Sequence, residues 1–350
     1  MIPVKSALSG IQTPRARSYA FRKVSMLTPK RARCFVLAAM MATGTAVAQA
    51  AFPFPVRPVR FIVGSPAGGG NDIVARILAA KLSEGYGHQV VVDNRGGANG
   101  IIGMELAARA APDGYTWYMG TAGHLSVNAV YYPKLPFNME RDFTPLTQVV
   151  TLPFLLYMHP SVPAKTLAEL VAHAKANPGK LAWSSSGDGG LPQFAGEMLK
   201  LAAGINTRRI PYKGSAPAFN DLLAGQVQYC IEAVPIGLQH VKSGRLLALA
   251  TTGAQRLPFL PDIPTIRETY AGYEVQNWYG MVLPAGMPRE LVNRLHADIS
   301  KAMNAPDIKA KLIAQGTDPV GSTPEAFAVF RKAEEGKWAR VIKEANIRPQ

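Results

Sequence analysis

Apolar and polar residues follow one another in blocks, and the first clear block predicts a strand, a loop and a helix in succession. Phe61–Val63 is a short apolar run of the kind that forms a buried strand. The glycine-rich segment Ser65–Gly70 interrupts it, and apolar residues at helical spacing follow. We expect Asn71 or Asp72 to cap this helix, because a side-chain oxygen there can accept the free amides of the first turn.

This turn is suited to binding an anion. Several backbone N–H groups and the positive end of a helix dipole point to one place, and glycines allow a ligand to approach the backbone closely. The loop lacks the lysine and Ser/Thr of a P-loop and does not fit G-x-G-x-x-G, so a nucleotide is not favoured. A glycine-rich turn without any ligand is the alternative.

The same succession occurs twice more along the chain. Val90–Val92 precedes a second glycine-rich loop, Asp93–Gly100, and a helical pattern at 101–110. Tyr115–Gly120 is a third strand, and Thr121–His124 leads towards another helix. Repeated strand–loop–helix units predict a parallel, doubly wound sheet, in which ligands bind beyond the carboxyl ends of the strands.

A second set of such units predicts a second lobe. Val149–Met158 is a long apolar strand that can carry the chain between lobes. Leu181–Ser184 then leads into a Gly/Ser loop at 185–190 and a helix at 192–203, and Gln226–Ile231 forms a strand with Glu232 at its carboxyl end.

We therefore predict an α/β fold of two αβ lobes joined by a hinge of two crossover strands, the second of them near 278–284. Residues 51–152 and 280–350 form lobe 1, and residues 153–279 form lobe 2. Facing loops would enclose a small molecule by hinge closure.

The N-terminus predicts a secretory signal peptide at 1–50. Lys30, Arg31 and Arg33 precede the apolar run Cys34–Val47, and small residues follow up to Ala50. We expect cleavage after Ala50 or Ala48, with Met26 as an alternative start. The mature protein is then expected to be exported, soluble and unanchored.

Charge excludes one class of partner. The net charge is +15, but residues 1–50 hold eight of the 38 basic residues and no acidic one, which leaves 30 basic against 23 acidic residues, or +7. No basic stripe interleaved with aromatic residues is visible after residue 50, so no nucleic acid partner is expected.

Motifs for catalysis and metal binding are missing from the sequence. The six histidines are scattered, and no G-x-S-x-G motif occurs. We expect no catalytic residue, metal or cofactor, and Cys230, left alone after cleavage, to be a buried inert thiol. The alternative function is an exported serine hydrolase using Ser185 or Ser186, which a serine-reactive probe would label.

The candidate ligand-binding residues lie in the predicted loops at the carboxyl ends of strands. For four of them a purely structural role is the alternative to ligand binding. His124 could make a local hydrogen bond or face solvent, and Asp72 could cap a helix or brace a loop. Glu232 could face solvent or cap a helix, and Lys213 could simply be solvated. We expect Gly69→Val to abolish binding. The candidates are Ser65, Pro66, Gly68, Gly69, Gly70, Asn71, Asp72, Thr121, His124, Ser185, Ser186, Gly187, Asp188, Gly189, Lys213, Gly214 and Glu232.

Short motifs spread over 53–347 resemble one family, the Bug-type periplasmic solute-binding receptors of the tripartite tricarboxylate transporter system. They are Pro55–Val63, Pro66–Asp72, Val90–Arg95, Ala111–Thr116, Asn177–Leu181, Pro211–Ala218, Leu260–Thr265 and Pro319–Glu325.

The resemblance implies a periplasmic-binding-protein type II fold (a "Venus flytrap") and a monomer in the periplasm. It implies a small organic acid, a carboxylate or related amide, held largely by backbone groups and water from the loops at 65–72 and 184–190. The implied partners are the membrane permease subunits of a tripartite tricarboxylate transporter, with a membrane sensor as the alternative partner.

The sequence departs from the family pattern at three places. Ala67 replaces a proline of the first loop, Asp188–Pro192 lack the usual hydroxyl, and Ile231–Glu232 stand where Phe-Asp is common. Glu232 is longer than aspartate, so it either shrinks the cavity or reaches further towards a ligand amine.

Overall fold

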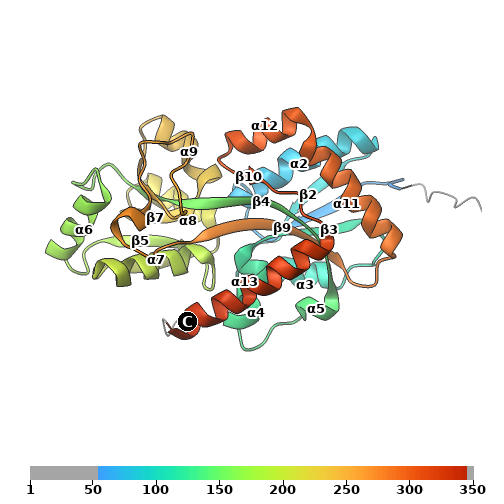
Figure 1. Ribbon diagram of the computed structural model, residues 1–350, viewed down its shortest axis with the longest axis horizontal. Helices are drawn as coiled ribbons and strands as arrows, with labels where there is room; N and C mark the ends of the chain where they lie inside the picture. Colours follow the sequence, from blue (N-terminus) through green and yellow to red (C-terminus); the bar gives the residue numbers. More distant parts are fainter. Residues whose placement is uncertain (1–53, 345–350) are drawn as a thin grey trace, which may run out of the picture. The chain divides into compact units, whose positions relative to one another are not determined.

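The computed structural model describes residues 54–344, in which two sets of strands are joined along one long strand (Figure 1). The predicted signal peptide lies outside the described residues. Among the described residues, no helix combines the length and the apolar character needed to cross a membrane.

The first strand set contains the three predicted units. Strand β1 pairs in parallel with both β2 and β3, and α2 and α3 connect them. The elements are β1 (Val59–Val63), α2 (Gly70–Tyr86), β2 (Val90–Asn94), α3 (Ile101–Ala108) and β3 (Thr116–Thr121).

Strand β4 (Phe143–Met158) joins the two sets. Its residues up to Pro153 pair with β9 (Gln276–Pro284), which also pairs with β3, whereas its residues from Phe154 pair with β7 and β8. The predicted crossover at 149–158 therefore does change partners along its length. Strand β9, which contains the second predicted crossover, runs antiparallel to β3 and to the first part of β4.

The second strand set repeats the architecture of the first. Strand β5 pairs in parallel with β6 and β7, and β7 and β8 run antiparallel to β4. The strands are β5 (Ala182–Ser186), β6 (Arg208–Tyr212), β7 (Tyr229–Ala233) and β8 (Leu247–Thr251), with helices α6 (Leu167–Ala176), α7 (Leu191–Ala203), α8 (Ser215–Leu223) and α9 (Val234–Lys242).

Long C-terminal helices return to the first strand set, as Figure 1 shows in orange and red. They are α11 (Arg289–Asn304), α12 (Pro306–Ala314) and α13 (Pro324–Glu344). Short elements complete the fold: the π-helical turn η1 (Gly123–Val127), α4 (Asn128–Tyr131), α5 (Met139–Asp142), α10 (Ile266–Thr269) and β10 (Asp318–Pro319).

Close packing fixes helix α7 against its sheet. An added Cβ at Gly196 would lie 2.2 Å from the fully buried ring of Trp183 on β5, so only glycine permits this approach. The contact places the loop between β5 and α7 at the carboxyl edge of the strands.

One local prediction is wrong. The N-cap of α2 is Gly69, not Asn71 or Asp72, which lie inside the first turn. Glu232 lies at the carboxyl end of β7, as predicted, but it is 1% exposed, so the solvent-facing alternative for this residue does not hold. Helix α9 was not predicted from the sequence. It accommodates Pro235 in its first turn, where the backbone N–H has no partner within the helix.

Candidate functional site

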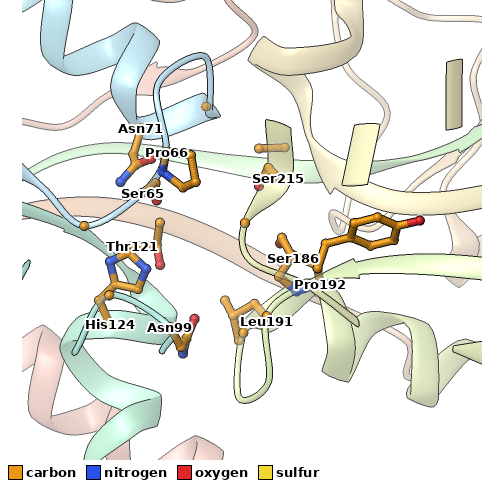
Figure 2. Close-up of a pocket in the computed structure, with 18 of the residues that line it drawn as sticks. Ser65, Pro66, Asn71, Asn99, Thr121, His124, Ser186, Leu191, Pro192 and Ser215 are labelled. Carbon is orange, nitrogen blue, oxygen red and sulfur yellow. The ribbon is translucent and has the colours of Figure 1, made fainter. Parts of the chain in front are cut away.

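A cavity of about 260 Å³ lies between the two strand sets, at the carboxyl ends of their parallel strands. Figure 2 shows Ser65, Thr121 and His124 on one side of it and Ser186, Pro192 and Ser215 on the other. Phe154 of β4 and Asn277 and Tyr279 of β9 line it between the two sides.

The cavity has two walls of different chemistry. The neutral wall, from the first strand set, consists of Gly64, Ser65, Pro66, Gly70, Asn71, Gly97, Ala98, Asn99, Gly100, Thr121, His124 and Tyr132. The charged wall, from the second set, consists of Ser186, Gly187, Asp188, Gly190, Leu191, Pro192, Pro211, Tyr212, Lys213, Gly214, Ser215, Glu232 and Ala233.

Asp72 braces the first glycine loop behind the neutral wall. Its Oδ2 accepts hydrogen bonds from the backbone N–H of Gly68 (2.8 Å) and from Arg76 Nε (3.0 Å), and its Oδ1 accepts one from Asn94 Nδ2 (2.8 Å). Asn94 Nδ2 also donates to the carbonyl of Ser65 (3.1 Å). The Asp72 carboxylate therefore stabilises the loop through these hydrogen bonds and does not line the cavity.

Asn71 presents an unused donor at the neutral wall. The residue is 2% exposed, lines the cavity, and its Nδ2 has no hydrogen-bond partner. Buried polar atoms are normally paired, so an unpaired donor beside a cavity indicates a place for a ligand acceptor.

The loop after β2 has an unusual backbone. All four residues of 97–100 have positive φ, including the non-glycine residues Ala98 (46°) and Asn99 (48°). Asn99 Nδ2 donates to Asn128 Oδ1 (2.7 Å), and Asn128 Nδ2 donates back to the Asn99 carbonyl (2.9 Å), so α4 holds the loop. Left-handed non-glycine residues are held in place only by surrounding structure and concentrate at functional sites.

His124 is a neutral side chain of this wall. It is 5% exposed, and burial lowers its pKa to about 3, so the imidazole carries no charge near neutral pH. Its Nδ1 lies 3.0 Å from the hydroxyl of buried Tyr118. The wall therefore offers backbone groups, amides, hydroxyls and one neutral ring, but no ionised side chain.

The charged wall holds an ion pair next to its glycine loop. Asp188 Oδ1 lies 2.8 Å from Arg209 Nη2, and Gly189 N–H donates to Gln193 Oε1 (2.8 Å). Tyr132 from the neutral wall donates its hydroxyl to the Asp188 carbonyl (2.8 Å), which links the two walls. The pairing with Arg209 reduces the repulsion that Asp188 would exert on an anionic guest.

Glu232 is a buried carboxyl group of the charged wall. Burial raises its pKa to about 7, although hydrogen bonds from Ser186, Ser215 and the Ala233 N–H oppose that shift. Its Oε1 has no hydrogen-bond partner.

Within the described part of the chain, five α-helices begin at the cavity, and this is the main electrostatic feature of the site. The lining includes the N-cap or first residue of α2, α3, α7, α8 and α9: Gly70, Gly100, Gly190, Gly214 and Ala233. The first N–H groups of an α-helix have no partner within the helix, and its N-terminus carries partial positive charge. The arrangement can bind an anion without an ionised cationic partner.

Most, but not all, of the candidate residues line the cavity. Gly68, Gly69, Asp72, Ser185 and Gly189 do not. An added Cβ at Gly70 would lie 2.5 Å from Tyr279 Oη and 3.1 Å from Ala233 Cβ, and one at Gly214 would lie 2.6 Å from Pro66 of the neutral wall. At Gly69 the nearest atom is the local Pro66 carbonyl.

Several lining residues were not among the candidates. The loop at 97–100 carries the same strand–glycine loop–helix signal as the first loop, so the sequence offered a way to find it. Tyr132, Asn277 and Tyr279 come from segments with no local sign of a site, and only the tertiary structure brings them to the cavity.

The geometry gives no support to metal binding or serine catalysis. Among residues 54–344 there is no group of three or more His, Cys, Asp and Glu side chains that could hold a metal ion. Ser185 is fully buried with its Oγ bonded to Arg209 Nη1 (3.3 Å), and Ser186 bonds to Glu232. His124 lies on the opposite wall from Ser186 (Figure 2).

Comparison with known proteins identifies relatives across nearly the whole described chain. Residues 74–347 match the family model described as "Tripartite tricarboxylate transporter family receptor". The "UPF0065 protein in tcbD-tcbE intergenic region" of Pseudomonas sp. (strain P51) is 39% identical over 313 residues, 89% of this chain and 93% of that protein.

Solved structures agree with this assignment. "R. palustris Rpa4515 with adipate" has a TM-score of 0.82 at 34% identity, covering 85% of this chain and 100% of the other. The periplasmic binding protein BugD has a TM-score of 0.81 at 35% identity, covering 85% of this chain and 100% of BugD. MatC from Rhodopseudomonas palustris, with bound malate, has a TM-score of 0.77 at 29% identity, covering 83% of this chain and 100% of MatC. The predicted two-lobed mixed α/β architecture is confirmed, and the chain belongs to the tripartite tricarboxylate transporter receptor family of solute-binding receptors.

Proposed function

We propose that this receptor captures a small carboxylic acid in the cavity between its two walls and delivers it to the membrane permease subunits of a tripartite tricarboxylate-type transporter. The convergence of five helix N-termini on one cavity carries the proposal. Relatives of the same fold are described with adipate and with malate, both of them dicarboxylates.

The energetics favour an anion held by backbone groups. A charge near one helix N-terminus gains about 0.3–1 kcal/mol, and a hydrogen bond to a charged group contributes about 1.5–3 kcal/mol. Several such contacts together suffice for tight capture without a fixed cation. The neutral wall adds no competing carboxylate, because Asp72 is directed to the loop behind it.

Size restricts the solute. The cavity volume of about 260 Å³ is below the range of about 300–1,000 Å³ that is typical of pockets for drug-sized ligands. A short mono- or dicarboxylate fits this volume better than an extended or branched ligand.

Membership of the family and the sequence of residues 1–50 support export to the periplasm and a permease partner. A cleaved signal peptide would leave a monomeric receptor that closes around its solute and docks on permease subunits. A membrane sensor remains the alternative partner, and a pull-down of the loaded receptor with permease or sensor subunits separates the two.

A thermal-shift screen tests the proposal. The protein from Ala51 is heated with acetate, succinate, malate, adipate, citrate and the neutral diamide of adipic acid. A bound acid stabilises the folded state by about 2.7 kcal/mol at a hundredfold excess over its Kd. We expect at least one acid to raise Tm and the diamide to raise it less; no shift with any acid contradicts the proposal.

A further inference from the structure

The carboxyl group of Glu232 lines the cavity that we propose binds an acid. The residue lines the cavity from strand β7, is 1% exposed, and has one oxygen, Oε1, without a hydrogen-bond partner. Asn71 Nδ2, from the neutral wall, is a second buried polar atom without a partner beside the same cavity. An acceptor-bearing ligand would satisfy the amide, but an ionised Glu232 would repel the same ligand.

The groups packed around Glu232 do not offset that repulsion. The titratable neighbours are Tyr157 of β4, Tyr279 of β9 and Cys230 of β7, and burial raises the pKa of each, so all three stay protonated and uncharged near neutral pH. Ser186 of β5 and Ser215 of α8 supply neutral hydroxyls.

Three other ionisable residues at the cavity have surroundings of their own, and burial raises the pKa of the lining residues Tyr132 and Tyr212 to about 12, so both stay protonated. Asp188 is paired with Arg209, Lys213 is exposed, and His124 is held neutral by burial. Burial raises the pKa of Glu232 to about 7, and a ligand carboxylate would raise it further, because keeping two nearby carboxylates ionised costs free energy. A protonated Glu232 becomes a donor, as Asn71 is.

We propose that Glu232 couples capture of the solute to uptake of one proton. A carboxylate ligand enters the cavity, one proton from solvent binds the Glu232 carboxylate, and the resulting neutral acid donates a hydrogen bond to the ligand. The inference rests on the proposed function, since it needs a carboxylate ligand. It makes Glu232 a specificity residue that favours carboxylates at or below neutral pH.

Calorimetry on the intact receptor tests the coupling. The probe is the acid of the screening panel that stabilises the wild-type protein most, adipate if several do so. Titrations near pH 7.5 in two buffers of different ionisation enthalpy measure the protons taken up, which we expect to number between about one half and one per ligand. Affinity should fall about tenfold between about pH 6 and about pH 8.

Two variants assign the effect. Glu232→Gln keeps a neutral side chain of the same length, so it should lose both the proton uptake and the pH dependence. Glu197→Gln, whose carboxylate pairs with Lys200 on α7 away from the cavity, should keep the pH dependence of the wild type. Titration of the probe acid itself is common to all three proteins.

The outcomes are distinct. Binding by the wild type without proton uptake, or an unchanged pH dependence in Glu232→Gln, overturns the inference and leaves the receptor function standing. Loss of binding by folded Glu232→Gln at every pH also overturns it, because it shows an ionised Glu232 accepting from the ligand. If no acid binds the wild type, the proposed function fails first, and the inference falls with it.

Discussion

The two walls of the cavity have the same architecture but differ in their ionisable side chains. Each presents glycine-rich loops that follow parallel strands and lead into helix N-termini. The neutral wall directs its nearest carboxylate, Asp72, into its own loop, whereas the charged wall exposes Asp188, Lys213 and Glu232 to the cavity.

The difference separates two tasks. Backbone amides bind a carboxylate whatever the remainder of the solute is, and a braced loop keeps them in place. Ionisable side chains respond to the charge and the hydrogen-bonding groups of the solute. We therefore expect changes in the neutral wall to affect whether an acid binds, and changes in the charged wall to affect which acid binds and at what pH.

The largest expected effect concerns stability and lies in the charged wall. Because the Glu232 pKa is raised from 4.5 to about 7, the folded protein retains a proton that the unfolded chain releases, and stability falls as pH rises across that interval. Glu232→Gln removes this penalty. We expect it to raise the free energy of unfolding by about 3 kcal/mol near pH 8, and by much less near pH 4.

Urea unfolding at both pH values measures this difference. Glu197→Gln serves as the matched control and should show no comparable gain at high pH. An equal effect of Glu232→Gln at both pH values would contradict a raised pKa and attribute the change to packing.

The next effect tests the brace of the neutral wall. Asp72→Ala removes the acceptor of three hydrogen bonds, from Gly68, Arg76 and Asn94, and should cost about 2 kcal/mol of stability while weakening ligand binding. Glu105→Ala, which breaks an exposed ion pair with Arg109, should cost less than about 0.5 kcal/mol and leave binding unchanged. Equal losses in the two variants would show that the brace contributes nothing special.

A third change tests the closeness of the walls. In Gly70→Ala the added methyl group would clash with Tyr279 and Ala233. We expect this overpacking to cost about 2 kcal/mol, which corresponds to about 30-fold weaker ligand binding. Gly85→Ala lies in the same helix with no atom within 4 Å of the new methyl, so it should add about 1 kcal/mol of helix stability and leave affinity unchanged. Titration with the panel acid decides; wild-type affinity in Gly70→Ala would contradict the contact.

The smallest effect is expected at the exposed rim of the charged wall. Lys213 is exposed at the cavity, so its charge acts mainly on a ligand that is still approaching from solvent. Lys213→Gln should therefore slow the association of a dianion a few-fold and reduce the salt dependence of the association rate. Stopped-flow measurements at two ionic strengths test this. A large increase in the dissociation rate would instead mean that Lys213 contacts the bound acid.

Much of the fold was predictable because its signals are local. Apolar runs ending in glycine-rich loops predict β1, β2, β3 and β5 with the helices that follow them, and the long apolar run predicts the strand shared by both sets. The N-cap of α2 was missed by two or three residues, because Gly69 is followed by polar residues that also cap helices well. The exact lobe boundaries at 152 and 280 stay predictions.

The site was predictable only where a loop carries its own signal. The first loop and the β5–α7 loop were found from glycines next to strands. The role of Asp72 as a brace was open in the sequence, and its three hydrogen bonds decide it. Asn277 and Tyr279 could not be found, because their side of the cavity exists only once β9 lies beside β3 and β4.

The amino-acid sequence by itself determined the repeated strand–loop–helix units, the placement of helix N-termini at strand ends, and hence the preference for an anion, since each depends on residues close in the chain. Tertiary structure alone decided the chemistry of the two walls. A carboxylate is a brace, an ion-pair member or a proton acceptor according to the partners it is buried with, and Asp72, Asp188 and Glu232 have different partners. The partners Asn94, Arg209 and Ser215 come from other segments of the chain, so no local pattern encodes them.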